Sequence, residues 1–355
     1  MGPQEREGAP VRRRRPAVMA DVGRLAGVSH QTVSRVINGS RHVSPGTRER
    51  VLAAMSELGY RPNSIARALV TGRSRTLGVV SLDTTLYGPA STLFGIERAA
   101  HEAGYFIMIA SLQALDRSSV GEAIDRLRLQ AVEGILVIVS DVEAAEALVA
   151  VRPDLPMVAV EGGPVPGTPV VAVDQLAGAT AATRHLLEIG HRTVWHVRGP
   201  LGSIEAQQRE RAWRETLIAA GVRPPALLTG DWSAHSGYEL GHWLARESDA
   251  TAVFVANDQM ALGLLRALHE AGLEIPQDVS VVGFDDIPEA AYFLPPLTTI
   301  RQDFGELGSR SLRVLVGRLE ASGSDVLEPS GSTIEPELVI RASTGPAPLR
   351  RRRAR

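Results

Sequence analysis

The stretch that decides the fold of the N-terminal part is His30-Gln31-Thr32-Val33-Ser34-Arg35-Val36-Ile37. Read as a helix, it has two different faces. Its apolar residues recur at helical spacing along one stripe: Val33, Val36 and Ile37. Its hydrogen-bonding side chains gather on the opposite face: His30, Gln31, Ser34 and Arg35. A short helix with a narrow apolar stripe and such a polar face is suited to the major groove of DNA.

Apolar residues at helical spacing predict one further helix on each side of this one. Before it they are Val22, Leu25 and Ala26, and after it Val51, Leu52, Met55 and Leu58. Gly27-Val28 provides a turn, Ser29 is a suitable N-cap, and Ser44-Pro45 has the pattern of a helix start. Together these signals predict a helix-turn-helix domain. A plain three-helix bundle would leave the polar face and the local charge unexplained.

Charge is distributed unevenly along the chain. Residues 1–75 carry 14 arginines and 5 acidic residues, whereas residues 76–349 carry 19 basic and 35 acidic residues. The last six residues add five arginines. A basic module on an acidic body predicts a polyanionic partner for the module alone.

Composition limits the remaining possibilities. The chain has 355 residues, enough for more than one domain of ~100–200 residues. It has no cysteine, which excludes disulfides, thiolate zinc sites and cysteine nucleophiles. No apolar run approaches the ~18 residues of a membrane span, and the arginine-rich start has no apolar signal region. We therefore expect a cytoplasmic, nucleoid-associated protein.

After residue 75 the pattern changes to apolar runs with helical stretches between most of them. The runs are 77–82, 106–110, 134–139, 156–160, 193–197, 252–256 and 279–284. Near-continuous apolar strands with helical crossovers indicate parallel sheets covered on both faces. The sequence therefore predicts a small all-α helix-turn-helix domain followed by an α/β core of two doubly wound lobes. In such sheets, ligands bind at the carboxyl ends of the strands.

Polar residues stand where several of these strands end. Asn257 and Asp258 follow one strand, Asp285 and Asp286 follow another, and Arg209 lies on a helix that begins near the 199–201 turn. A site that binds a sugar needs several planar hydrogen-bond donors and acceptors and one flat apolar surface. Trp232 would supply that surface. We expect Asp258 and Asp286 to cap the helices that follow them. Trp232 as simple core packing remains the alternative.

Several motifs point to a known family. In the first domain they are Ala26-Gly27-Val28-Ser29, residues 32–39 and Leu58-Gly59-Tyr60-Arg61-Pro62-Asn63, followed by Ala66-Arg67-Ala68-Leu69, and in the core they are residues 230–234, 255–263 and 296–304. These motifs resemble the lactose repressor (LacI/GalR) family. The resemblance implies a periplasmic-binding-protein-like core crossed three times by the chain. The expected divisions are a disordered basic arm (1–17), a helix-turn-helix domain (18–62), a hinge helix and linker (63–75), a core (76–345, with lobes 76–173 plus 302–332 and 174–301 plus 333–345) and a disordered arginine-rich tail (346–355).

On the DNA side, we expect His30, Gln31 and Arg35 to read bases, since arginine pairs bidentately with guanine and glutamine with adenine. Side chains better placed for phosphates are Thr32, Ser34 and Asn38. The segment 63–70 is too short for a stable helix alone, because helices below ~12–15 residues are marginal. It is therefore expected to fold on binding. The resemblance implies that Ala66 and Leu69 enter the minor groove.

On the ligand side, the resemblance implies an inducer pocket. Its expected residues are Arg209, Trp232, Asn257, Asp285, Gln302 and Leu307, with Pro89 and Glu161 from the first lobe. Two positions depart from the family pattern: Ala114 aligns with an arginine, although Arg117 lies nearby, and Glu205 aligns with a serine. These departures count against a lactose-type ligand and leave another carbohydrate open. No cofactor, metal or catalytic residue is expected.

The resulting hypothesis is a homodimeric repressor that binds a palindromic operator and is released by a small carbohydrate. The chain ends without heptads, which predicts a dimer and no tetramerising coil. One alternative of the same fold is a corepressor-type regulator that binds DNA only with a ligand such as a purine. A sugar-binding transport protein conflicts with the fused DNA module. An enzyme such as a sugar kinase is disfavoured because the chain has no P-loop or nucleophile elbow.

Overall fold

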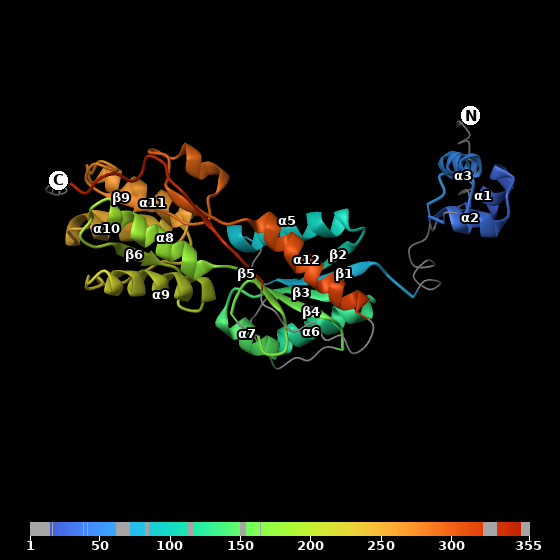
Figure 1. Cartoon of the computed structure of the whole chain (residues 1–355), viewed down its shortest axis with the longest axis horizontal. Helices are drawn as coiled ribbons and strands as arrows, with labels where there is room; N and C mark the ends of the chain where they lie inside the picture. The colour runs from blue at the N-terminus through green and yellow to red at the C-terminus, as the bar shows by residue number, and fades with distance from the viewer. Residues whose placement is uncertain are drawn as a thin grey trace, which may run out of the picture. The chain divides into compact units, whose positions relative to one another are not determined.

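The computed structural model divides the chain into two compact units, Met1–Ser74 and Arg75–Arg355 (Figure 1). The structure describes residues 15, 17–37, 39–40, 42–61, 72–81, 85–112, 117–149, 154–163, 165–321 and 332–348. Three of the expected DNA-contacting residues, Asn38, Ala66 and Leu69, therefore lie outside the described residues, as does Ala114.

The first unit is the expected trio of helices, α1 (Met19–Ala26), α2 (His30–Ile37) and α3 (Pro45–Glu57). Gly27 adopts a φ of 66° between α1 and α2, a left-handed conformation that glycine takes without strain. Ser29 accepts a hydrogen bond from the Thr32 amide at 3.2 Å, and Ser44 caps α3 by accepting one from the Thr47 amide. The buried core contains six small side chains: Val22, Ala26, Val33, Val36, Val51 and Ala54.

The apolar stripe of the third helix differs from the expected one. Val51 is buried and Met55 is partly buried, but Leu52 and Leu58 are exposed, and Ala54 occupies the buried face instead. A small residue fits there because α3 packs closely against α1. Leu52 lies one position off that face, so its size does not bring it into the core.

The first lobe of the second unit is built on a six-stranded sheet in the order β11-β5-β4-β3-β1-β2, with all neighbours parallel. Helices α5 and α12 pack on one face and α6 and α7 on the other. Its strands are β1 (Thr76–Ser81), β2 (Phe106–Ser111), β3 (Ile135–Ile138), β4 (Met157–Val160), β5 (Val170–Val173) and β11 (Ser332–Ile334). Its helices are α5 (Tyr87–Glu102), α6 (Arg117–Leu129), α7 (Val142–Val149) and α12 (Phe304–Glu320).

The second lobe holds a four-stranded parallel sheet in the order β7-β6-β8-β9 and an antiparallel pair, β10 with β12. Helices α8 and α9 cover one face of the sheet, and α10 and α11 cover the other. The strands are β6 (Trp195–Arg198), β7 (Leu228–Thr229), β8 (Ala252–Val255), β9 (Ser280–Val282), β10 (Thr299–Arg301) and β12 (Glu337–Val339). The helices are α8 (Gln175–Glu188), α9 (Ile204–Ala219), α10 (Ala234–Glu247), α11 (Asp258–Glu270) and the 3₁₀ helix η1 (Pro288–Tyr292).

The predicted fold class, with two parallel-sheet lobes covered on both faces, is confirmed. The chain passes between the lobes three times, after β5, after β10 and after β11. The last passage comes slightly later than the sequence suggested, because Ser332–Ile334 still pairs with β5 of the first sheet. Strand β2 also differs from a buried parallel strand: it is an edge strand, and Phe106 is 67% exposed.

Glycines bring the elements of the second lobe close enough to form a site. A Cβ at Gly263 on α11 would collide with the Ala234 carbonyl oxygen, and one at Gly237 on α10 would collide with that of Met260. Because neither position carries a side chain, the two helices pack backbone to backbone. Their N-termini follow Trp232 and Asn257, so this packing holds those two residues beside each other.

None of the described helices is both long enough and apolar enough to span a bilayer.

Candidate functional site

The polar face of α2 is available at the surface of the first unit. His30, Gln31 and Arg35 are exposed, whereas Val33 and Val36 are buried against α1 and α3. Thr32 and Ser34 are half-buried on the flank of the helix. Thr32 is also held by the N-cap, with its hydroxyl 3.0 Å from that of Ser29. The helix therefore presents three hydrogen-bonding side chains on a face fixed by two buried valines.

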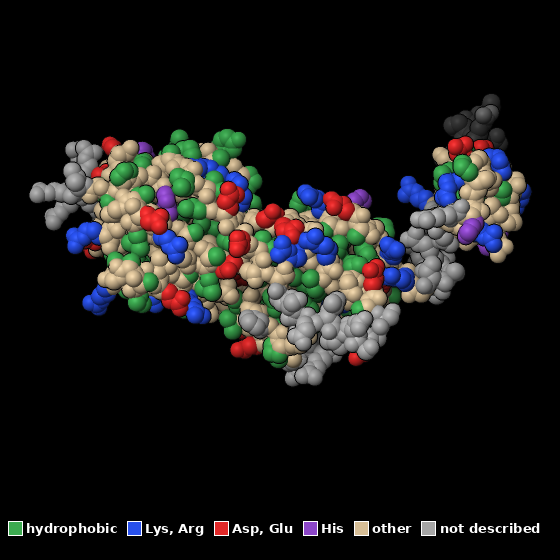
Figure 2. All heavy atoms as spheres, in the orientation of Figure 1, with side chains coloured by type: hydrophobic (Ala, Val, Ile, Leu, Met, Phe, Trp, Pro, Cys, Tyr) green, Lys and Arg blue, Asp and Glu red, His purple; other side chains and the backbone are tan. Residues whose placement is uncertain are grey.

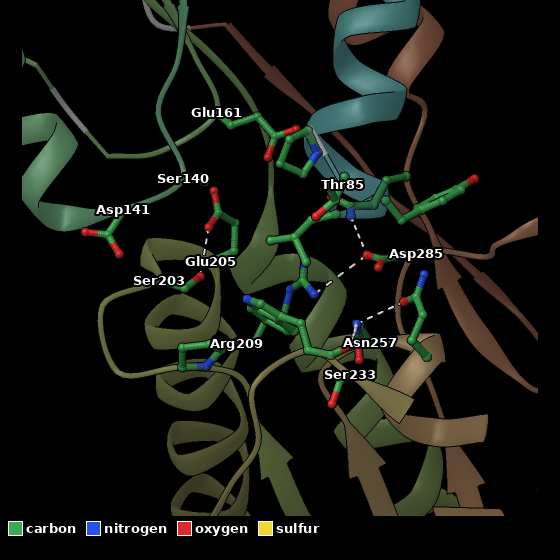
Figure 3. Close-up of a pocket in the computed structure, with 18 of the residues that line it drawn as sticks. Thr85, Ser140, Asp141, Glu161, Ser203, Glu205, Arg209, Ser233, Asn257 and Asp285 are labelled. Carbon is green, nitrogen blue, oxygen red and sulfur yellow. Dashed lines mark hydrogen bonds and ion pairs between the residues drawn. The ribbon is translucent and has the colours of Figure 1, made fainter. Parts of the chain in front are cut away.

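A cavity of about 440 Å³ lies between the two lobes of the second unit. This volume is in the range of small-molecule sites, ~300–1,000 Å³. Seven of the residues expected from sequence line it: Pro89, Glu161, Arg209, Trp232, Asn257, Asp285 and Gln302. Figure 3 shows side chains entering it from both lobes. The cavity therefore lies where strand ends of both sheets meet, as the strand-end argument predicts.

Leu307 is also predicted to line the cavity, but the structure places its side chain outside it. It is fully buried in the core of the first lobe, in a cluster with Phe304 and Leu312. All three side chains belong to a stripe of buried residues that recurs at helical spacing along α12 and packs on the sheet. Leu307 is thus a packing residue in this structure.

Arg209 is the centre of a buried hydrogen-bonding network. Its Nε donates to Gln175 Oε1 at 2.9 Å, and its guanidinium also donates to the Ala256 carbonyl oxygen. Asp285 Oδ1 lies 3.7 Å from the same guanidinium and accepts from Gln302 Nε2 at 2.8 Å. Gln302 in turn accepts from Gln175 Nε2 at 2.8 Å, which closes the ring of contacts.

Burial and charge oppose each other in this network. Burial raises the pKa of Asp285 to about 6, and the charge of Arg209 and the hydrogen bond from Gln302 act in the opposite direction. Burial also lowers the pKa of Arg209, which Asp285 partly counteracts. The guanidinium stacks on Phe284, with its central carbon 3.7 Å from the ring centroid. Arg209 and Asp285 are therefore oriented before any ligand arrives.

Asp258 is predicted to cap the following helix, but in the structure the adjacent Asn257 is the cap. Asn257 lines the cavity but also caps α11, accepting from the Met260 amide at 3.0 Å, and it donates to the Trp232 carbonyl oxygen. Asp258 is not the cap. It is fully buried and accepts from Thr299 Oγ1 at 2.6 Å and from the Ile287 amide at 2.9 Å. Burial raises its pKa well above the usual range, as does the nearby charge of Asp285.

Asp286 is also predicted to cap a helix, and it does not. Its carboxylate pairs with Arg301 at 2.7 Å and with Arg341 at 2.6 Å, outside the cavity. These pairs connect β10 to the segment that follows β12. Both aspartates thus stabilise long-range contacts, which short-range capping rules do not describe.

Trp232 both packs and lines the cavity. Part of its ring contacts the apolar core beneath α10 and α11, and a Cβ at Gly199 would overlap the ring. Its backbone has a φ of 74°, unusual for a residue with a large side chain. The Arg209 guanidinium carbon lies 5.7 Å from the ring centroid. The ring is therefore fixed at the cavity wall beside the charged network.

Two glutamates face the cavity from opposite lobes (Figure 3). Glu161, just after β4, accepts from Thr92 Oγ1 at 2.7 Å, and burial raises its pKa. Glu205, in the first turn of α9, accepts from Ser203 Oγ at 3.0 Å. Burial, followed by the charge of Glu161, raises the pKa of Glu205 to about 8. The sequence indicates Glu205 only as a departure from the family pattern.

The lobes also touch directly beside this pair. The Val142 amide donates to the Gly202 carbonyl oxygen at 3.1 Å, and the Ile204 amide donates to that of Ser140 at 3.2 Å. Asp141 and Ser203 line the cavity from these two segments. Asp141 follows β3, so the strand-end signal used for Asn257 could have found it. Ser203 has only the sequence signal of a helix cap, and its position at the cavity depends on contact with the first lobe.

The described residues contain no cluster of three histidine, aspartate or glutamate side chains placed to hold a metal ion. A helix-turn-helix domain followed by a two-lobed core with an interlobe cavity defines the class of bacterial DNA-binding regulators with a ligand-binding core. Residues 18–63 match the family described as bacterial regulatory proteins, lacI family, and residues 183–344 match a periplasmic binding protein-like domain. The chain belongs to the lacI family, which confirms the resemblance seen in the sequence.

Individual relatives match over nearly the whole chain. The lactose operon repressor of Escherichia coli K12 is 34% identical over 336 residues, covering 94% of this chain and 92% of the relative. The transcriptional repressor PurR of Haemophilus influenzae (strain PittEE) is 34% identical and covers 92% and 98%. A crystal structure of the lac repressor dimer bound to operator and the anti-inducer ONPF superposes with a TM-score of 0.82, at 34% identity, covering 93% and 100%. These relatives are transcriptional repressors.

Proposed function

We propose that this protein is a transcriptional repressor whose hold on operator DNA is controlled by a small carbohydrate bound between the lobes of its core. The observation that carries this proposal is the interlobe cavity, lined by an oriented arginine–aspartate network and a tryptophan ring, in a chain that also presents a recognition helix. The proposal assigns it no catalytic step and no cofactor. Binding of ligand would change how the lobes meet, and the hinge at 63–75 would carry that change to the DNA.

On the DNA, α2 would lie in the major groove with His30, Gln31 and Arg35 toward the bases. Thr32, Ser34 and Asn38 would contact phosphates, and Ala66 and Leu69 would enter the minor groove. The exposure of the first three side chains, on a face fixed by Val33 and Val36, supports their base-reading role.

Arg35→Ala is expected to weaken operator binding and relax its base preference, because a bidentate arginine–guanine contact discriminates by ~1–3 kcal/mol. The measurement is fluorescence anisotropy against the operator and single-base variants, at fixed salt. Arg211→Ala, an exposed arginine on α9, is the matched control and should bind like the parent. Equal loss for every sequence would instead assign Arg35 to a phosphate contact.

On the ligand side, the planar groups of Arg209, Asp285, Asn257 and Gln302 supply the directed hydrogen bonds that sugar hydroxyls require. Trp232 supplies an aromatic wall against which a sugar ring can pack. A thermal-shift panel of sugars and purines identifies the ligand, and operator affinity with and without it gives the sign of the effect. Weaker DNA binding with ligand supports induction. Tighter binding with a purine stacked on Trp232 would make the protein a corepressor-controlled regulator.

The protein is proposed to act as a homodimer. Large apolar side chains are exposed on both lobes (Figure 2), among them Phe94 and Phe106 on the first and Tyr292 and Leu294 on the second. Leu294 is 92% exposed, and Tyr292 is 85% exposed. Exposed large apolar side chains that gather in a patch are usually covered by a partner, and we propose that these residues belong to such a patch. A second copy is the partner that a two-half-site operator requires.

Leu294→Glu and Phe106→Glu are expected to convert the dimer to a monomer, because each would bury a charge in the proposed interface. Operator affinity should fall at least ~100-fold, since the second half-site contact is no longer intramolecular. Sedimentation velocity and anisotropy measure the two effects. Ile218→Glu, also at an exposed apolar position but on α9, should remain dimeric. Dimers in both interface variants would place the interface elsewhere.

A further inference from the structure

The described residues that line the cavity include more acidic than basic side chains. Four carboxyl side chains, Asp141, Glu161, Glu205 and Asp285, share it with one guanidinium, that of Arg209. A neutral sugar would satisfy hydrogen bonds in such a site, whereas a cation would also stabilise the ionised form of the buried carboxyl groups, whose pKa values burial raises.

Arg209 makes its direct contacts with groups other than the two glutamates. Its nearest carboxylate is Asp285 at 3.7 Å, and its other donors serve Gln175 and the Ala256 carbonyl oxygen. Arg209 therefore balances Asp285 first. Glu161 and Glu205 are a second acidic group, which the charge of Arg209 reaches only at longer range.

Glu205 also has an unused acceptor. The residue is 7% exposed, and its Oε2 accepts from Ser203, but its Oε1 is buried with no hydrogen-bond partner among the described residues. A buried polar atom left without a partner costs free energy that a ligand donor would recover. Figure 3 shows this carboxyl and that of Glu161 approaching the same part of the cavity from the two lobes.

We propose that the effector is an amino sugar whose ammonium group sits between Glu161 and Glu205. This inference rests on the proposed function and names the ligand class for the same cavity. An ammonium group offers three donors and one positive charge, so it supplies the missing partner of Glu205 Oε1 and offsets both carboxylates. The remaining hydroxyls face Arg209, Asp285 and Asn257, and the ring packs on Trp232. Because Glu161 belongs to the first lobe and Glu205 to the second, the same ammonium group would hold the lobes together.

Titration calorimetry on the full chain tests this with matched probes: glucosamine, galactosamine and mannosamine, each beside its neutral parent and its N-acetyl derivative. At least one amine is expected to bind about 10- to 100-fold more tightly than its two neutral counterparts, because charge-assisted hydrogen bonds are about twice as strong as neutral ones. In Glu205→Gln the preference should fall by about 10-fold, because only Glu161 then offsets the ammonium charge. Glu215→Gln, at an exposed position on the same helix, should keep it.

Equal or tighter binding of a neutral or acetylated sugar overturns the inference, as does an undiminished preference in Glu205→Gln or the absence of binding by every amine. These failures differ from failure of the proposed function. A neutral sugar that binds and alters operator affinity would leave the repressor assignment intact. Loss of operator binding by the parent protein would remove the repressor assignment whatever the cavity binds.

Discussion

Arg209→Ala is expected to abolish binding of the effector and to destabilise the core unit by roughly 3–5 kcal/mol, the usual cost of removing one partner of a buried ion pair. Arg209 is 4% exposed, and its guanidinium holds Asp285, Gln175 and the Ala256 carbonyl oxygen together. Its loss leaves the Asp285 carboxylate buried without a cation. Chemical denaturation followed by tryptophan fluorescence measures the stability, since all four tryptophans lie in the second unit: Trp195, Trp213, Trp232 and Trp243.

Stability and binding can be separated in this variant. Adding Asp285→Asn to Arg209→Ala removes the uncompensated charge, so much of the lost stability should return while the sugar still fails to bind. Arg211→Ala, which replaces an exposed side chain two residues after Arg209 on α9, should change neither quantity. If the sugar shifts the melting of Arg209→Ala as much as that of the parent protein, the cavity is not the effector site.

Much of the candidate site was predictable because parallel sheets bring their strand ends to one edge. Polar residues directly after apolar runs identified Asn257 and Asp285, and both line the cavity. The helix-turn-helix domain was equally accessible, because its caps and stripes involve residues within a few positions of each other. Local rules succeed where the partners are local.

The remaining features depend on partners far along the chain. Asp258 accepts from Thr299, 41 residues away, so its sequence neighbours could not distinguish it from a helix cap. Leu307 was expected in the cavity, but the orientation of α12 on its sheet turns that side chain into the core. Glu161 follows β4 of the first lobe, and Glu205 lies at the start of α9 in the second lobe. The two side chains therefore come together only when the lobes meet.

Glu205 should make the core unit less stable as the pH rises. Its pKa is about 8 in the folded state against an ordinary 4.5, because of burial and the charge of Glu161. Between these values the folded state holds a proton that the unfolded state has released, so the free energy of unfolding falls with rising pH. The slope from this one group is up to about 1.4 kcal/mol per pH unit, and the effect is complete above pH 8.

The Glu205→Gln variant isolates this contribution. Asp285 and Asp258 also have raised pKa values, and they lower stability in the same direction in both proteins. Glu161 acts in the same direction, and the loss of the neighbouring Glu205 charge makes its ionisation easier in the variant. The difference between parent and variant, followed by tryptophan fluorescence in urea from pH 5 to 9, should therefore grow in favour of the variant up to about pH 8 and then level off. Glu215→Gln should run parallel to the parent throughout. Parallel curves for Glu205→Gln as well would mean that Glu205 is ionised at neutral pH in the empty cavity. A variant that gains stability at the position where ligand contact is proposed would show that the core gives up stability to keep an ionisable carboxyl group there, as functional sites commonly do.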